Sequence, residues 1–175
     1  MNTQSTILFL ELGCLDNGHP AVRRIDASQT GSSRTAPDST FVSYGEVFAK
    51  IIAPYADDIE IVITDWTAVH VPLADFRRQL PKYVAARVVD SIYLEELTNS
   101  SWSDYHSALA TRYACIQLWL SRRRPDCTQD WLALDLGCQL DDWPKDERKH
   151  LVCGSFSDTN VQHQLAQKLG EREKS

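Results

Sequence analysis

The chain has 175 residues, which is the length of one ordinary domain. Hydrophobic residues make up 43% and charged residues 24%, a balance that excludes a disordered tail and a chain embedded in a membrane. Lys and Arg total 18 against 24 Asp and Glu, and the resulting net charge of -6 argues against nucleic acid and anionic membrane surfaces as partners.

The N-terminal residues carry neither the basic nor the apolar segment of a secretion signal. No apolar run approaches the roughly 18 residues of a membrane span. The five cysteines are spaced irregularly and form no C-x-x-C pair, which argues against a zinc ribbon and a thioredoxin-type redox site. We therefore expect a cytoplasmic protein with free thiols.

Buried strands are predicted by runs of apolar residues that favour β-structure. The clearest runs cover residues 7–12, 59–63 and 131–136. Shorter or more mixed runs at residues 87–92 and 151–153 predict a fourth and a fifth strand.

Amphipathic helices are predicted between these strands by apolar residues that recur at helical spacing. Proline delimits two of them, because Pro54 ends the first helix and Pro81 stops the second. The expected helices cover residues 41–52, 73–80, 106–123 and 158–170, with the end at 171–175 frayed.

The alternation of strands and helices predicts an α/β fold, because parallel strands need crossover connections that place helices on the faces of the sheet. We expect one domain over residues 1–175, with a mainly parallel sheet and helices on both faces. Residues 16–39 are rich in Gly, Pro, Ser, Thr and Asp, and we expect them to form a long loop.

Polar residues follow the predicted strands at the ends where ligands bind in parallel α/β sheets. Glu11 stands at the end of the first clear strand and Asp135 at the end of the third, while Thr64 and Asp65 follow the second. Carboxylates and a hydroxyl at one edge suit a cation of the magnesium type, which prefers oxygen ligands. The same residue types also satisfy turns and helix caps, so a structural role stays open for each of them.

Four motifs in chain order resemble the haloacid dehalogenase superfamily, and most closely its small bacterial members. The apolar run Ile7–Leu15 matches the family's hydrophobic strand with D-x-D-G-V-L, and Ile61–Trp66 matches its Ser/Thr-rich turn before Trp. The segment Thr111–Leu120 is similar to the family's basic residue at the start of a helix with a Trp-Leu pair, and Trp131–Asp135 to its W-L-A-L-D-D strand. The likeness covers most of the chain.

This resemblance implies an α/β fold of the haloacid dehalogenase type, with residues 16–40 as a loop or vestigial cap. It also implies hydrolysis of a phosphate ester through an aspartyl-phosphate, with Mg²⁺ beside the nucleophile. Carried over by position, Thr64 and Arg112 would hold the phosphoryl group, and Glu11 and Asp135 would hold the metal.

The first motif departs from the family pattern at both catalytic positions. Glu11 replaces the nucleophilic Asp, and its extra methylene moves the carboxylate by about 1.5 Å, whereas misplacement by about 1 Å can already cost about 10²-fold in rate. Gly13 replaces the proton donor, and loss of general-acid help costs roughly 10²- to 10⁴-fold. Asp16 is the candidate that could replace the donor from a shifted turn.

The last motif is also incomplete, because Leu136 stands where the family has a second Asp. Asp141 or Asp142 in the next loop could compensate. We therefore expect a protein that has lost standard phosphatase chemistry, needs no cofactor, and binds another protein or a phosphorylated small molecule. The alternative is a magnesium-dependent phosphohydrolase with a rearranged site that uses Glu11 and Asp16.

Other sites find less support in the sequence. Cys14 follows a strand and could pair with His19 as a nucleophile, but it lacks the flanking pattern of a nucleophile elbow. A zinc site from Cys14 and Cys138 has unhelpful spacing. A third class, an unrelated nucleotide-binding α/β protein, lacks any glycine-rich phosphate loop.

Two surface features bear on partners. The basic run Arg122–Arg124 complements the dipole at a helix end, or contacts an acidic partner. Trp102 and Trp143 stand beside Ser and Asp residues and are candidates for an exposed partner surface.

Overall fold

A computed structural model describes residues 5–15, 44–65, 72–92, 111–125, 130–137, 140 and 143–172. Its strands form one five-stranded sheet in the order β3-β2-β1-β4-β5, and every neighbouring pair is parallel. The strands are β1 (Thr6–Leu10), β2 (Ile59–Ile63), β3 (Val88–Ser91), β4 (Trp131–Asp135) and β5 (Leu151–Cys153).

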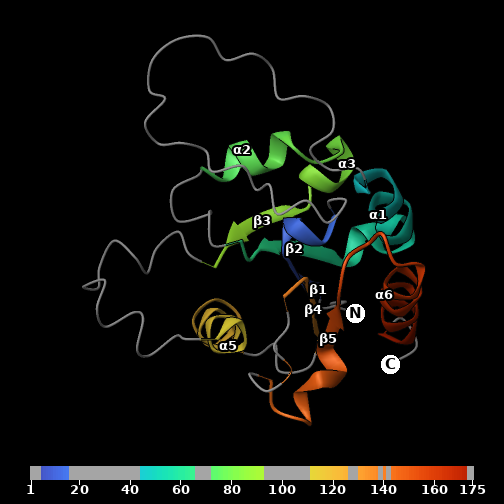
Figure 1. The fold of residues 1–175 in the computed structure, drawn as a ribbon. Helices are drawn as coiled ribbons and strands as arrows, with labels where there is room; N and C mark the ends of the chain where they lie inside the picture. The colour runs from blue at the N-terminus through green and yellow to red at the C-terminus, as the bar shows by residue number, and fades with distance from the viewer. Residues whose placement is uncertain are drawn as a thin grey trace, which may run out of the picture.

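The helices lie on both faces of this sheet, with α1 and α6 on one face and α5 on the other (Figure 1). The α-helices are α1 (Gly45–Ile52), α2 (Leu73–Arg78), α3 (Lys82–Ala85), α5 (Arg112–Arg123) and α6 (Thr159–Arg172). Short 3-10 helices are η1 (Leu12–Leu15), η2 (Ala53–Asp58) and η5 (Glu147–His150). The predicted α/β class with a parallel sheet is confirmed.

The core is built on the two faces of the central strand β1. On one face the ring of Phe9 meets Trp119 of α5 edge to face, with ring centroids 5.5 Å apart. The core also contains a second aromatic pair, Phe48 of α1 with Phe156 after β5, at 5.6 Å. Helices on both faces explain why the central strands read as continuous apolar runs rather than as alternating ones.

All five predicted strands are present, with small differences at their ends. The first strand ends at Leu10 rather than at residue 12, because the chain turns directly into η1, where the Cys14 amide donates to the Glu11 carbonyl at 3.0 Å. The predicted helix starts at residues 41 and 106, and the loop or cap at 16–40, lie outside the described residues.

Two expectations about individual residues are corrected by the structure, and a third cannot be followed. Trp143 is buried, not exposed, because its ring stacks on Trp131 and contacts Tyr113. Cys153 is disulfide-bonded, whereas a thiol was expected. Cys14 and Cys115 form no disulfide, as expected. Trp102 falls in a part of the chain that is not described.

The last helix also differs from the prediction, because α6 continues through Arg172 instead of fraying from residue 171. Arg172 anchors that end by donating to the Trp131 carbonyl at 2.8 Å. Among the residues that the structure describes, no helix has the length and apolar character needed to cross a membrane.

Candidate functional site

The strand order places a topological switch point between β1 and β4. The chain moves outward from β1 to β2 and β3, and then returns to the other side of β1 to form β4 and β5. Ligand sites of open α/β sheets lie at such a point, beyond the carboxyl ends of the strands. The backbone joins the three relevant strands there, since the Glu11 amide donates to the Leu134 carbonyl and the Thr64 amide to the Leu10 carbonyl.

Five polar residues meet at this point, and we call them the strand-tip cluster: Glu11, Thr64, Asp65, Arg112 and Asp135. Four of them are the described residues of the predicted site. Contacts with Arg112 bring Glu11, Thr64 and Asp135 together at this edge of the sheet.

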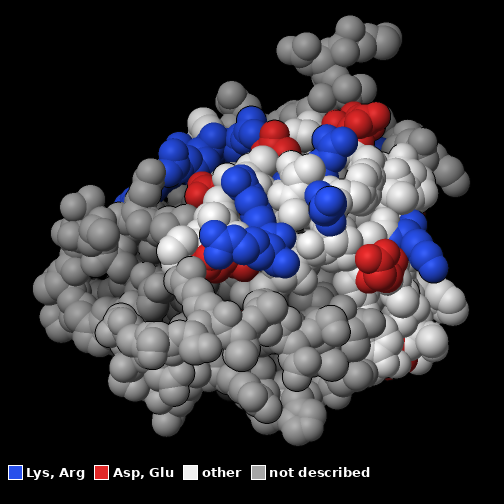
Figure 2. Space-filling model, turned by 90° about the horizontal axis from the view of Figure 1, so that it is seen from above, with Lys and Arg blue, Asp and Glu red and all other residues white. Residues whose placement is uncertain are grey.

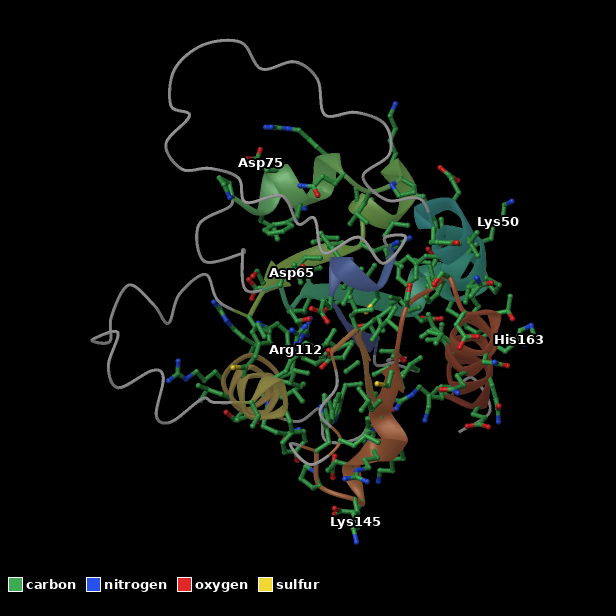
Figure 3. The ribbon with its side chains drawn as sticks, in the orientation of Figure 1. Lys50, Asp65, Asp75, Arg112, Lys145 and His163 are labelled. Carbon is green, nitrogen blue, oxygen red and sulfur yellow. The ribbon has the colours of Figure 1, made fainter. Side chains whose placement is uncertain are left out.

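Arg112 of α5 contacts three other members of the cluster. It is the first residue of α5, whose N-cap is Thr111, with a side-chain oxygen that accepts from the Ala114 amide at 3.2 Å. The arginine lies between α5 and the sheet (Figure 3). Its Nη2 donates to Glu11 Oε1 and its Nη1 to Thr64 Oγ1, both at 3.1 Å. Its Nε lies 3.5 Å from Asp135 Oδ2.

The Glu11 carboxylate is engaged through both of its oxygens. Oε1 accepts from Arg112 Nη2, and Oε2 accepts from the Leu136 amide at 2.7 Å. Arg112 Nη1 also lies 3.1 Å from Oε2. Glu11 thus links the end of β1 to the end of β4 and to the start of α5.

Asp65 is a buried acid beside these residues. Its Oδ2 accepts from the Leu12 amide at 2.7 Å, which ties the end of β2 to η1. Burial raises the pKa of Asp65 from 3.8 to about 6, and the nearby Glu11 charge adds to the rise, while the Leu12 hydrogen bond and Arg112 oppose it. A carboxyl group that changes protonation near neutral pH is typical of functional sites.

Asp135 ends β4 and is also buried. Burial raises the pKa of Asp135 to about 6 against the opposing effect of Arg112, and a hydrogen bond with Glu11 contributes to the rise. Its Oδ1 accepts from the Gly137 amide at 3.0 Å. Asp135 and Glu11 therefore face each other as neighbouring acids that share the charge of one arginine.

The cluster is largely closed to solvent. The side chain of Arg112 is 12% exposed, that of Glu11 18% and that of Asp135 5%, and Thr64 is also buried. The two residues assigned to phosphate, Thr64 and Arg112, hydrogen-bond to each other. An incoming anion would have to displace protein groups before it could bind.

Gly13 and Leu136, the two departures from the family motifs, face each other in space. A Cβ atom built on Gly13 would lie 3.3 Å from Leu136 Cδ2 and 4.0 Å from Glu11 Oε1. The space beside Glu11 where a side chain at position 13 would begin is therefore bordered by Leu136. Neither residue carries a group that can donate or accept a proton.

The described residues do not fit a Mg²⁺ site. Within the part of the chain that is described, no three His, Cys, Asp or Glu side chains form a group that could hold a metal. Glu11 and Asp135 supply carboxylate oxygens, but both face the Arg112 guanidinium. The predicted replacements Asp16, Asp141 and Asp142 lie outside the described residues.

Among the residues that the structure describes, the other sequence candidates do not form a second site. Cys14 is buried, and burial raises the pKa of its thiol well above the ordinary value, so it is not an activated thiolate. Its candidate partners His19 and Cys138 are not described. Of the basic run, Arg124 pairs with Glu60, and Arg123 lies 3.9 Å from Asp90.

The fold and the cluster define a parallel α/β protein with a charged site at its switch point. Comparison with protein-family models, with curated proteins and with solved structures finds no match for this chain.

Proposed function

We propose that the chain is a haloacid-dehalogenase-like protein without phosphatase chemistry, acting as a binding or regulatory module. Supporting this, the parallel sheet has a switch point between β1 and β4, and Glu11, Thr64, Arg112 and Asp135 meet beside it. These are the positions that the sequence resemblance assigns to the nucleophile, the phosphate contacts and the metal ligand.

The observation that carries the proposal is the engagement of Glu11. Both oxygens of Glu11 accept hydrogen bonds, one from Arg112 and one from the Leu136 amide, and these bonds fix the orientation of the carboxylate between the strand ends. Bonds between charged groups and those from a backbone amide to a carboxylate are among the stronger hydrogen bonds in proteins. Glu11 is held as a structural link between strands rather than poised as a nucleophile.

The missing proton donor supports the same conclusion. Gly13 has no side chain, and Leu136 lies against the space where a donor at that position would begin. Restoration of an acid at position 13 would therefore also require Leu136 to move. Neither position 13 nor position 136 therefore places an acidic group beside Glu11.

The closed cluster favours a protein partner over a phosphorylated small molecule. Arg112 and Thr64 are already paired with each other and with Glu11. On the face seen in Figure 2, Lys and Arg side chains lie beside Asp and Glu side chains instead of forming one basic field. Such mixed charge suits contact with the surface of another protein.

The second candidate function, a phosphohydrolase with a rearranged site, rests on Asp65. The pKa of this buried acid is raised to about 6, and the charges of Glu11 and Arg112 both act on it. Asp65 could hold the proton that Gly13 cannot supply. This reading requires Arg112 to release Glu11, and Asp65→Asn should then abolish turnover.

Titration with MgCl₂ and with inorganic phosphate tests whether the cluster is closed. We expect neither to shift the NMR signals of the Leu136 and Leu12 amides, because their acceptors Glu11 and Asp65 keep their present bonds. Arg78, in an exposed pair with Asp75, reports nonspecific ion effects. Saturable shifts at both amides, with Arg78 unchanged, would contradict the proposal.

A further inference from the structure

A second cluster of polar groups lies at the start of β4, at the opposite end of that strand from Asp135. It consists of the buried His150 at the end of η5, Arg172 at the end of α6, and the carbonyl oxygen of Trp131. We call these three groups the C-terminal latch. The strand-tip cluster contributes no residue to it, so the latch is independent of the proposed function.

The three groups of the latch are within hydrogen-bonding distance of one another. His150 Nδ1 lies 2.9 Å from the Trp131 oxygen. Arg172 Nη2 lies 2.8 Å from that same oxygen and 3.0 Å from His150 Nδ1. The imidazole is fixed in place because it stacks on the Trp131 ring, with centroids 4.4 Å apart and planes 14° apart.

These contacts cannot all persist in both protonation states of His150. When Nδ1 carries no proton, it accepts from Arg172, and the Trp131 oxygen also accepts from Arg172. When Nδ1 is protonated, it can only donate, and its available acceptor is the Trp131 oxygen. The imidazolium then loses the hydrogen bond from Arg172 to Nδ1, and its positive charge repels the guanidinium.

We propose that the C-terminal latch is a pH-sensitive device that holds the last turn of α6 while His150 is neutral and releases it on protonation. The last turn of α6 packs against the core and against η2. Leu169 is buried in the core, and a Cβ built on Gly170 would lie 3.2 Å from Tyr55 Oη of η2. Release would therefore loosen the contact between α6 and η2.

The charges around His150 set the direction of the effect. Burial lowers the pKa of His150, and Arg172 and Lys149 lower it further, while the Trp131 carbonyl and Glu147 oppose them. The Glu147 carboxylate lies 3.8 Å from Nε2. Two further charged residues flank these groups. Asp130 lies 3.8 Å from Arg172. Lys168 donates to the Lys149 carbonyl.

A lowered pKa means that the native state favours the neutral imidazole. The latch therefore contributes its full stability above the ordinary pKa of histidine, and this contribution is lost as the pH falls through the lower native pKa. We therefore expect the last turn of α6 to be released under mildly acidic conditions.

Hydrogen exchange of the backbone amides of residues 168–172 tests the latch in the full chain. Between about pH 7.5 and about pH 5, we expect their protection factors to fall about tenfold, the effect of losing one hydrogen bond from a charged donor. His150→Asn should remove this pH dependence, because an amide oxygen accepts from Arg172 at both values. The control is His163→Asn, because His163 is an exposed residue of α6, and this variant should keep the pH dependence.

Two outcomes would overturn the proposal: protection that does not change with pH in the unmodified chain, or a pH dependence that survives in His150→Asn. Should His150→Asn fail to fold, Arg172→Gln gives a second test. That variant should show low protection of the last turn at both pH values. High protection at neutral pH in Arg172→Gln would contradict the role of the arginine.

Discussion

Replacement of Arg112 by Met should lower the free energy of unfolding by about 3–5 kcal/mol, the range found when one partner of a buried ion pair is removed. The change leaves Glu11 and Asp135 as neighbouring buried acids without their shared positive charge. It also removes the donor to Thr64 Oγ1. Urea unfolding at neutral pH measures the loss.

The matched control for this variant is Arg78→Met, because Arg78 pairs with Asp75 on the surface and its side chain is 67% exposed. Exposed pairs of this kind contribute about 0–1 kcal/mol. A loss in Arg112→Met no larger than the loss in Arg78→Met would show that Arg112 does not hold the cluster together.

Asp65→Asn should have the opposite effect and raise the free energy of unfolding at pH 7 by about 2–3 kcal/mol. The pKa of Asp65 rises from 3.8 to about 6 on folding, so the native state favours the protonated carboxyl. A rise of about two pKa units corresponds to about 3 kcal/mol that is present below the unfolded pKa and lost as the pH rises through about 6. Asn is neutral throughout and retains an oxygen for the Leu12 amide.

The pH dependence gives the sharper form of this test. The unmodified chain should lose part of its stability between about pH 4 and about pH 7 through Asp65, and Asp65→Asn should show a smaller loss over that interval. Asp57→Asn is a suitable control, because Asp57 is almost fully exposed. Destabilisation by Asp65→Asn at neutral pH would contradict this prediction, because it would mean that the ionised carboxylate stabilises the fold.

Much of the sheet could be predicted because its strands are covered on both faces. Burial on both sides selects an uninterrupted apolar run such as Ile59–Ile63, and this pattern is visible without any tertiary information. The position of α2 could be predicted because Pro72 precedes the helix and Pro81 follows it, and proline limits a helix locally. The one-turn helix α3 was not predicted, since four residues carry too little periodicity.

The site was predictable only in part. Topology alone brings Glu11, Asp135 and Thr64 to one edge of a parallel sheet, so their convergence follows from the order of strands and helices. The hydrogen bond from the Leu136 amide to Glu11 depends on the exact turn after β4, which no sequence pattern specifies. The raised pKa of Asp65 depends on burial and is equally invisible in the sequence.

The errors at Trp143 and Arg172 have a common cause. Both residues stand in polar stretches, and local composition predicted exposure for one and fraying for the other. Long-range contacts decide both cases, because Trp143 stacks on Trp131 and Arg172 reaches the Trp131 carbonyl. A pattern of neighbours along the chain contains no information about a partner 41 positions away.

Turnover of a broad panel of phosphate monoesters with Mg²⁺ tests the central claim most directly. The unmodified chain and Glu11→Gln should both show no release of phosphate above the blank, because Glu11 is bonded through both oxygens and position 13 has no acid. Turnover in the unmodified chain that disappears in Glu11→Gln would contradict the claim and establish the strand-tip cluster as an active site.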